Sequence, residues 1–148
     1  MSKILIIEDE ESIRRVLKKV LIEEDNKHQF IEASDGVQGI EKIKSNKLNL
    51  ILCDIKMPKK DGIEVLQFII KECPEVPTIM ISGHGDLETA VESMRLGAFD
   101  YISKPPDLNR LLNSVRSALK NNDFTKKSRS NLKKSKEFEI IGDSNEIQ

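Results

Sequence analysis

The stretch Leu50-Ile51-Leu52-Cys53-Asp54 decides the fold, because it joins an apolar run directly to a single carboxylate. Four consecutive apolar residues bounded by turn signals, here Pro58 and Asp61-Gly62, predict a buried strand. A carboxylate at the end of such a strand needs a partner, since an unpaired buried charge costs a large amount of free energy. We therefore expect other polar groups to meet Asp54 where the strand ends.

Other apolar runs in the chain also end at polar residues. Strands predicted at residues 4–7, 78–81 and 99–102 are followed by an acidic pair, a hydroxyl and a cation, respectively. These polar residues are Glu8 and Asp9, Ser82, and Lys104. Carboxylates, a hydroxyl and an ammonium group gathered at one place would form a small site for a divalent metal ion and a phosphoryl group.

Helical periodicity separates the predicted strands. A weaker strand is predicted at residues 29–33. The predicted helices are a segment around residues 13–21, residues 35–45 with Val37, Ile40 and Ile43 inward, residues 61–72, residues 86–97, and a segment from residue 107 to about residue 119. Five strands that alternate with five helices predict an α/β fold with a parallel sheet, right-handed crossovers and helices on both faces. In such sheets the ligand site lies beyond the carboxyl ends of the strands, where the polar residues stand.

The helix ends carry signals of their own. Asp86 and Asp107 are expected to be N-cap residues, and Gly97 is expected to end the fourth helix. We interpret Asp61 as a helix cap and Asp100 as a turn residue.

Size and composition indicate a soluble protein with one domain and a remainder. The chain has 148 residues, of which 38% are hydrophobic and 33% charged, and its net charge is -1. No apolar run approaches the roughly 18 residues that cross a membrane, and the N-terminus lacks the cleavage site of a signal peptide. Cys53 and Cys73 have no metal-binding spacing, so we expect core thiols in a reducing cytoplasm.

Four segments together resemble the receiver domain of two-component response regulators. They are Glu8-Asp9-Glu10, the segment from Asp54 to Gly62, Ser82-Gly83-His84-Gly85, and Tyr101-Ile102-Ser103-Lys104-Pro105. The resemblance covers residues 3 to about 120. It implies a doubly wound, flavodoxin-like fold with five parallel strands in the order 2-1-3-4-5.

The resemblance also implies the chemistry of the acidic residues. Asp54 corresponds to the carboxylate that accepts a phosphoryl group from the phosphohistidine of a histidine kinase. The implied Mg²⁺ ligands are Glu8 (through a water molecule), Asp9, Asp54 and the backbone carbonyl of Lys56. Such a domain is a signalling protein and not an enzyme, apart from its own phosphorylation and dephosphorylation.

The resemblance implies that the remaining residues of the motif bind the phosphoryl group or respond to it. Lys104 and Ser82 would contact its oxygens. Tyr101 would turn inward when Ser82 moves, which reshapes the face made by the fourth helix, fifth strand and fifth helix. The Lys104–Pro105 peptide bond is expected to be cis in this family. Pro106 departs from the apolar residue that is common in receivers, which leaves the switching amplitude open.

Two other residues near the motif have simple interpretations. Glu8 stands where many receivers have Asp, and its longer side chain should still reach a metal-bound water. His84 lies in a Gly-rich loop and is interpreted as part of a flexible connection rather than as a general base.

The end of the chain has a different character. The segment 123–136 is polar and basic and is interpreted as a linker after a receiver at residues 1–122. Residues 137–148 resemble the opening of the AAA+ ATPase domain of sigma-54-dependent transcriptional activators. The segment 82–91 is also similar to the receivers of that nitrogen-regulator-like group. These likenesses imply control of transcription through an output domain in a longer chain. No helix-turn-helix is visible and the basic segment has no pattern, so we expect no direct binding of nucleic acid by this fragment.

Alternative functions remain open at this point. One is a free-standing receiver or phosphorelay protein, which differs only in its output. Another is a Mg²⁺-dependent phosphatase or phosphotransferase of the haloacid-dehalogenase kind, but such enzymes need a second Asp where Lys56 stands. Whether two chains form a homodimer is not decided by the sequence, because Asn121-Asn122-Asp123 interrupts any long heptad pattern.

Overall fold

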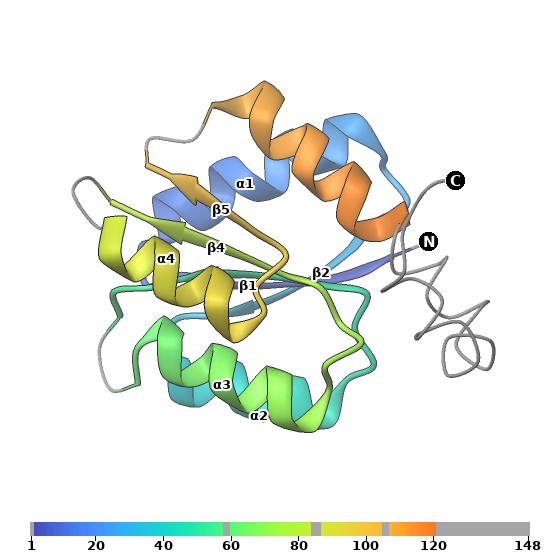
Figure 1. The fold of residues 1–148 in the computed structure, drawn as a ribbon. Coiled ribbons are helices and arrows are strands. Elements are labelled where there is room, and N and C mark those ends of the chain that lie inside the picture. Colours follow the sequence, from blue (N-terminus) through green and yellow to red (C-terminus); the bar gives the residue numbers. More distant parts are fainter. Residues whose placement is uncertain (1, 58–59, 84–86, 105–106, 121–148) are drawn as a thin grey trace, which may run out of the picture.

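A single parallel sheet forms the centre of the molecule (Figure 1). The computed structural model describes residues 2–57, 60–83, 87–104 and 107–120. The strands are β1 (Lys3–Ile7), β2 (Gln29–Ala33), β3 (Leu50–Asp54), β4 (Thr78–Ser82) and β5 (Asp100–Ser103). Their order across the sheet is β2-β1-β3-β4-β5, and every neighbouring pair is parallel. The predicted fold class and strand order are confirmed.

Helices cover both faces of this sheet (Figure 1). They are α1 (Glu11–Glu24), α2 (Gly36–Ser45), α3 (Gly62–Glu72), α4 (Leu87–Leu96) and a helix that the structure describes over residues 108–120. On one side lie α2, α3 and α4, and on the other lie α1 and the helix at residues 108–120. None of the described helices is long and apolar enough to span a membrane.

The alternation of side chains along β1 divides the core into two clusters. Leu5 and Ile7 pack on the side of α2 and α3, whereas Ile4 and Ile6 pack on the side of α1. All four are almost fully buried. An interior strand that is apolar on both faces is what a doubly covered parallel sheet requires.

Short polar side chains fix the helix ends largely as the sequence predicts. Asp61 accepts a hydrogen bond from the Glu64 amide, and the Glu64 side chain accepts one from the Asp61 amide, which forms a capping box at the start of α3. Asp107 accepts bonds from two amides of the following helix. Gly97 follows α4 with a positive φ of 117°. The expected cap at Asp86 lies outside the described residues.

Two expectations about single residues are wrong. Val37 is 42% exposed rather than inward, because α2 turns Gly36, Gly39 and Ile43 toward the core instead. Asp100 is not a turn residue but the first residue of β5. Its carboxylate accepts hydrogen bonds from side chains of the helix at residues 108–120, which ties that helix to the strand.

Candidate functional site

The register of the sheet brings two buried carboxylates side by side. Ile7 of β1 pairs with Cys53 of β3, so the next residues, Glu8 and Asp54, emerge together at the carboxyl ends of these strands. Glu8 is 1% exposed and Asp54 4% exposed. Ser82, which is fully buried, ends the neighbouring strand β4. The polar residues predicted from the strand ends therefore gather at one edge of the sheet.

Lys104 reaches into this edge from the end of β5. Its Nζ lies 3.1 Å from Oδ2 of Asp54, to which it donates a hydrogen bond, and 2.9 Å from Oε1 of Glu8. The backbone amide of Lys104 donates to the Ser82 carbonyl oxygen at 2.6 Å, which fixes the start of the side chain beside β4. The ammonium group is thus placed to neutralise both carboxylates.

Burial and charge act in opposite directions on the ionisation of this cluster. Burial raises the pKa of Glu8 to about 7, against the opposing effect of Lys104. Burial also raises the pKa of Asp54, and Lys104 again opposes the shift. Burial lowers the pKa of Lys104, but its contacts with Glu8 and Asp54 outweigh that effect and leave the pKa raised. The single ammonium group of Lys104 therefore offsets only part of the cost of burying the charges of Glu8 and Asp54.

The donor set fits a hard divalent cation. One carboxylate oxygen from each of Glu8, Asp9 and Glu10 lies within 4.8 Å of the others. Oε1 of Glu8 is buried and accepts no hydrogen bond from the described residues, so its contact with Lys104 is an ion pair without hydrogen-bond alignment. Carboxylate oxygens are the ligands that Mg²⁺ prefers, with water completing the shell. Asp54 lies beside Glu8 at the end of β3 but is not part of this close group, so its role as a metal ligand stays a prediction. Glu10 belongs to the acidic segment noted in the sequence, but it was not predicted to be a metal ligand, and this grouping makes it a further candidate.

The turn that carries these acids is held by backbone contacts. The Glu8 amide donates to the carbonyl of Ala33 at the end of β2, and the Glu10 amide donates to Oε2 of Glu8. The Glu8 carbonyl accepts a 2.6 Å hydrogen bond from Nη1 of Arg14. Nothing in the sequence pattern indicates this role for Arg14, because a bond from a side chain to a backbone atom requires no particular partner residue.

The loop after Asp54 depends on a glycine. The Gly62 amide donates to the carbonyl of Ile55 at 2.7 Å, so α3 begins directly against the end of β3. A Cβ atom at Gly62 would lie 2.3 Å from the backbone oxygen of Asp54 and 2.6 Å from the Cα of Ile55. Only glycine allows this approach. Lys56, which follows Ile55, is exposed. The role of its backbone carbonyl as a metal ligand stays a prediction.

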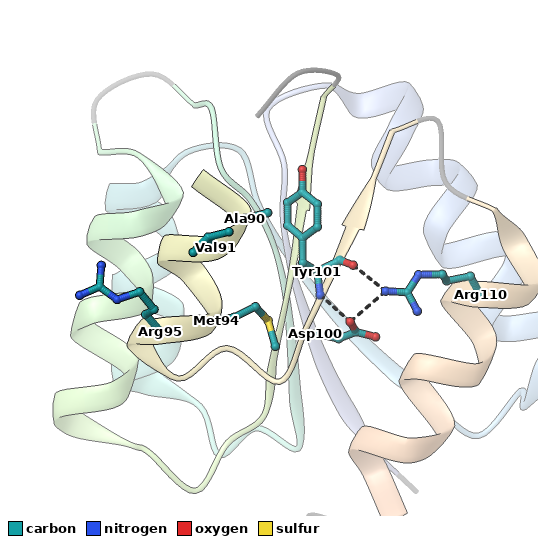
Figure 2. Close-up of a pocket in the computed structure, with 7 residues that line it drawn as sticks. All are labelled: Ala90, Val91, Met94, Arg95, Asp100, Tyr101 and Arg110. Atoms are coloured by element: carbon teal, nitrogen blue, oxygen red, sulfur yellow. Dashed lines mark hydrogen bonds and ion pairs between the residues drawn. The ribbon is translucent and has the colours of Figure 1, made fainter. Parts of the chain in front are cut away.

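Tyr101 lies on the same side of the sheet as Ser82. Tyr101 pairs with Met80 on β4, and Ser82 lies two positions further along that strand, so both side chains point to the same face. Figure 2 shows the Tyr101 ring extended beside Ala90 of α4. The ring borders an open hollow of about 550 Å³, which is lined by Ala90, Val91, Met94, Arg95, Asp100, Tyr101 and Arg110. This hollow gives the ring space next to α4.

Some sequence predictions fall on residues that the structure does not describe. These are the cis bond between Lys104 and Pro105, the effect of Pro106, the loop position of His84, and the linker and tail from residue 123 onward.

Comparison with known proteins agrees with this geometry. The family model described as the response regulator receiver domain matches residues 4–116. The chain is 35% identical over 147 residues to the nitrogen assimilation regulatory protein NtrX of Azorhizobium caulinodans, which covers 98% of this chain and 32% of that protein. It is 32% identical over 114 residues to the DNA-binding transcriptional regulator NtrC of Proteus hauseri, which covers 77% of this chain and 24% of that protein.

A solved structure shows the same architecture. A response regulator receiver domain protein from Clostridium thermocellum matches with a TM-score of 0.77 at 32% identity, over 84% of this chain and 98% of that chain. This chain spans about a quarter to a third of the length of the two curated relatives. The family match, the strand order 2-1-3-4-5 and the acids at the ends of β1 and β3 agree, and the chain belongs to the response regulator receiver domain family.

Proposed function

We propose that this chain is a phosphorylation-controlled switch in which Asp54 accepts a phosphoryl group from a histidine kinase. The observation that carries the proposal is the buried Asp54 carboxylate, held 3.1 Å from the Lys104 ammonium and beside Glu8. An aspartate can attack phosphorus when the repulsion between its charge and the phosphoryl oxygens is shielded. The cluster offers a cation for that purpose and acids that bind a second one.

The second cation is Mg²⁺, on which receiver domains generally depend. We assign it to Glu8, Asp9 and Asp54, with the Lys56 carbonyl as a further ligand. When bound, Mg²⁺ supplies positive charge that shields the phosphoryl oxygens from the carboxylates. The fit is supported by the buried Glu8 Oε1 and by the excess of carboxylates over ammonium groups among the described residues of the site.

The chain's own residues then perform the transfer. An oxygen of ionised Asp54 forms a bond to phosphorus while the bond between phosphorus and the kinase histidine nitrogen breaks, and that nitrogen keeps the electron pair. Lys104 is already beside the Asp54 carboxylate and would pair with a phosphoryl oxygen as a point charge. The Ser82 hydroxyl would donate a hydrogen bond to another phosphoryl oxygen.

Movement of Ser82 is the proposed link to the output face. Ser82 and Tyr101 share one face of the sheet, and the Tyr101 ring borders an open hollow beside α4, so solvent rather than packed side chains lies on that side of it. We infer that Ser82 moves toward the phosphoryl group and that Tyr101 turns into the space it leaves. The face made by α4, β5 and the helix at residues 108–120 would change shape as a result.

The output is proposed to be transcription, through an AAA+ domain that interacts with sigma-54 in a longer chain. The similarity to NtrX extends over 147 residues and so includes the segment after the receiver. This extent favours a receiver at residues 1–122, a linker at residues 123–136 and the start of an output domain at residues 137–148. A homodimer that responds to phosphorylation is part of the same proposal.

Mass spectrometry of the intact protein tests the proposed function. The protein is incubated with acetyl phosphate as donor, with and without Mg²⁺, alongside Asp54→Asn. We expect a gain of one phosphoryl group that requires both Mg²⁺ and Asp54. A wild-type protein that gains no phosphoryl group in Mg²⁺ would contradict the proposal.

A free-standing receiver or phosphorelay protein is the second candidate. It is favoured by the Clostridium thermocellum receiver protein, whose chain is matched over 98% of its length. Phosphorylation of Asp54 would be the same in both cases. Transfer of the phosphoryl group from Asp54 to a histidine phosphotransfer protein, instead of a change in assembly, would select this candidate.

A further inference from the structure

A side chain behind the acidic turn holds the backbone between its first two acids. Nη1 of Arg14 donates a 2.6 Å hydrogen bond to the carbonyl oxygen of Glu8. That carbonyl belongs to the peptide unit that joins Glu8 to Asp9. Because the peptide unit is planar, fixing its oxygen also fixes the plane from which the Asp9 side chain leaves the backbone.

Arg14 is itself held from a second element. Its Nε donates to Oε1 of Glu32 on the edge strand β2 at 2.9 Å, and Lys18, one turn further along α1, binds Oε2 of the same carboxylate at 2.7 Å. The Arg14 side chain is 15% exposed, so the guanidinium is well shielded from water. The contacts with Arg14 and Lys18 hold the pKa of Glu32 below its ordinary value, with Lys18 contributing more.

The fork of the guanidinium group explains why arginine suits this position. One nitrogen binds a backbone carbonyl of the acidic turn while another binds a carboxylate of a neighbouring strand. A planar guanidinium makes both bonds from one rigid group, which an ammonium group on a flexible stem does not do. The turn is thereby tied to the edge of the sheet as well as to α1.

We propose that Arg14 is a positioning residue for the divalent cation, acting through the Glu8–Asp9 peptide unit, with Glu32 fixing its orientation. This inference rests on the proposed Mg²⁺ site. Arg14 does not touch the cation. It keeps the carboxylates of Glu8 and Asp9 in the arrangement that binds the cation, in the way that outer contacts commonly orient metal ligands.

Electrostatics and positioning predict opposite effects of removing Arg14. A positive charge near a cation site repels the cation, so its loss by itself would tighten metal binding. Loss of a positioning contact would weaken metal binding, commonly by 10-fold or more for outer contacts of a metal site. The sign of the change therefore separates the two effects.

The test is a titration of the full chain with Mn²⁺, in which electron paramagnetic resonance measures the free ion, for wild type, Arg14→Met and Arg15→Met. Arg15 is the matched control, because it is the next residue of α1, carries the same charge and pairs only with Glu11 among the described residues. We expect Arg14→Met to bind Mn²⁺ about tenfold more weakly. Arg15→Met should bind it as tightly as wild type or slightly more tightly.

Two further variants test whether the positioning role requires the guanidinium group of Arg14 and its contact with Glu32. Arg14→Lys keeps the charge but cannot form both bonds at once, so it should restore only part of the affinity. Glu32→Gln leaves Arg14 in place without its charged partner and should weaken binding several-fold. Urea unfolding in chelator is measured on each variant, because a merely structural role would lower stability while leaving the metal affinity of the folded protein unchanged.

Each result decides a different point. Wild-type affinity or tighter binding in Arg14→Met overturns the positioning role while the metal site itself stands. If Arg14→Met does not fold, Arg14→Lys decides in its place, and unchanged affinity there overturns the role. A wild-type protein that binds no Mn²⁺ overturns the proposed metal site and this inference together.

Discussion

Lys104 Nζ lies 2.9 Å from Oε1 of Glu8, although Glu8 follows the first of the described strands, β1, and Lys104 follows the last, β5. The same ammonium group binds Asp54. Lys104 thus neutralises the carboxylates that would also bind the proposed Mg²⁺, and we expect the two cations to compete for them. Several measurable consequences depend on this contact and on the geometry around it.

Replacement of Lys104 by Met should destabilise the metal-free protein and tighten its binding of Mg²⁺. The buried Glu8 and Asp54 would lose their shared cation, which we expect to lower the free energy of unfolding in chelator by about 3 kcal/mol. Added Mg²⁺ should restore most of this loss. Urea unfolding with and without Mg²⁺ measures both effects, and Lys71→Met on the exposed face of α3 is the control. Equal Mg²⁺ affinity in Lys104→Met and wild type would show that the cations do not compete.

The stability of the metal-free protein should fall as pH rises from about 4.5 to about 7. The pKa of Glu8 is raised by burial from 4.5 to about 7, so within this range the folded state holds a proton that the unfolded state has lost. Stability contributed by a raised pKa is present below the unfolded value and is lost as pH rises through the folded value. Asp54, whose pKa is also raised, acts with the same sign.

Glu8→Gln tests this pH dependence. Since one pKa unit corresponds to about 1.4 kcal/mol, the shift in the pKa of Glu8 from 4.5 to about 7 gives its contribution an upper bound of about 4 kcal/mol. Urea unfolding in chelator at several pH values should show a shallower pH dependence in the variant. The lowered pKa values of Glu24, Asp25 and Glu32 act only at more acidic pH, where they reduce stability as pH falls. An identical profile in Glu8→Gln and wild type would contradict the assignment to Glu8.

Gly62→Ala should be strongly destabilising. The added Cβ would meet backbone atoms of Asp54 and Ile55 at 2.3 and 2.6 Å, and this backbone cannot move aside without shifting Asp54. We expect a loss of about 3 kcal/mol in the free energy of unfolding. Gly83→Ala is the matched control, because its Cβ would meet nothing within 4 Å and the change should stay within about 0.5 kcal/mol. Equal stability of the two variants would contradict the close approach at Gly62.

Phosphorylation should change the fluorescence of Tyr101. The chain has one Tyr and no Trp, so its intrinsic emission reports this side chain alone. Acetyl phosphate with Mg²⁺ should alter the emission of wild type, because the ring is proposed to turn into the space left by Ser82. Asp54→Asn should show no change in emission on this treatment. Ser82→Ala should show a change that differs from that of the wild type. Ser103→Ala, an exposed position on β5, is the control. Identical changes in emission in Ser82→Ala and Ser103→Ala would contradict the proposal that movement of Tyr101 depends on Ser82.

The sequence is sufficient to predict the sheet and the meeting of its polar ends. Apolar runs such as residues 50–53 are local patterns, and a parallel sheet places the residues that follow them at one edge. Asp54, Glu8 and Lys104 are therefore found together as expected. The capping box of Asp61 and Glu64 is equally local and is visible as residue types at a fixed spacing.

Features that depend on tertiary contacts are not visible in the sequence. The periodicity of α2 placed Val37 inward, but the close approach of Gly39 to Ile7 turns another face of the helix to the core. Leu87, Val91 and Met94 look like core residues yet are exposed on α4. The bond from Arg14 to the Glu8 carbonyl leaves no pattern either, since every residue has a carbonyl.

The central claim is that Asp54 is the residue that receives the phosphoryl group. The direct measurement is to phosphorylate the protein with acetyl phosphate and Mg²⁺, reduce it with borohydride, and map the product by peptide mass spectrometry. Borohydride converts an aspartyl phosphate to homoserine and so marks the modified position. We predict homoserine at position 54 alone in the wild type. Homoserine at Asp9 or another acid, with Asp54 unchanged, would contradict the account.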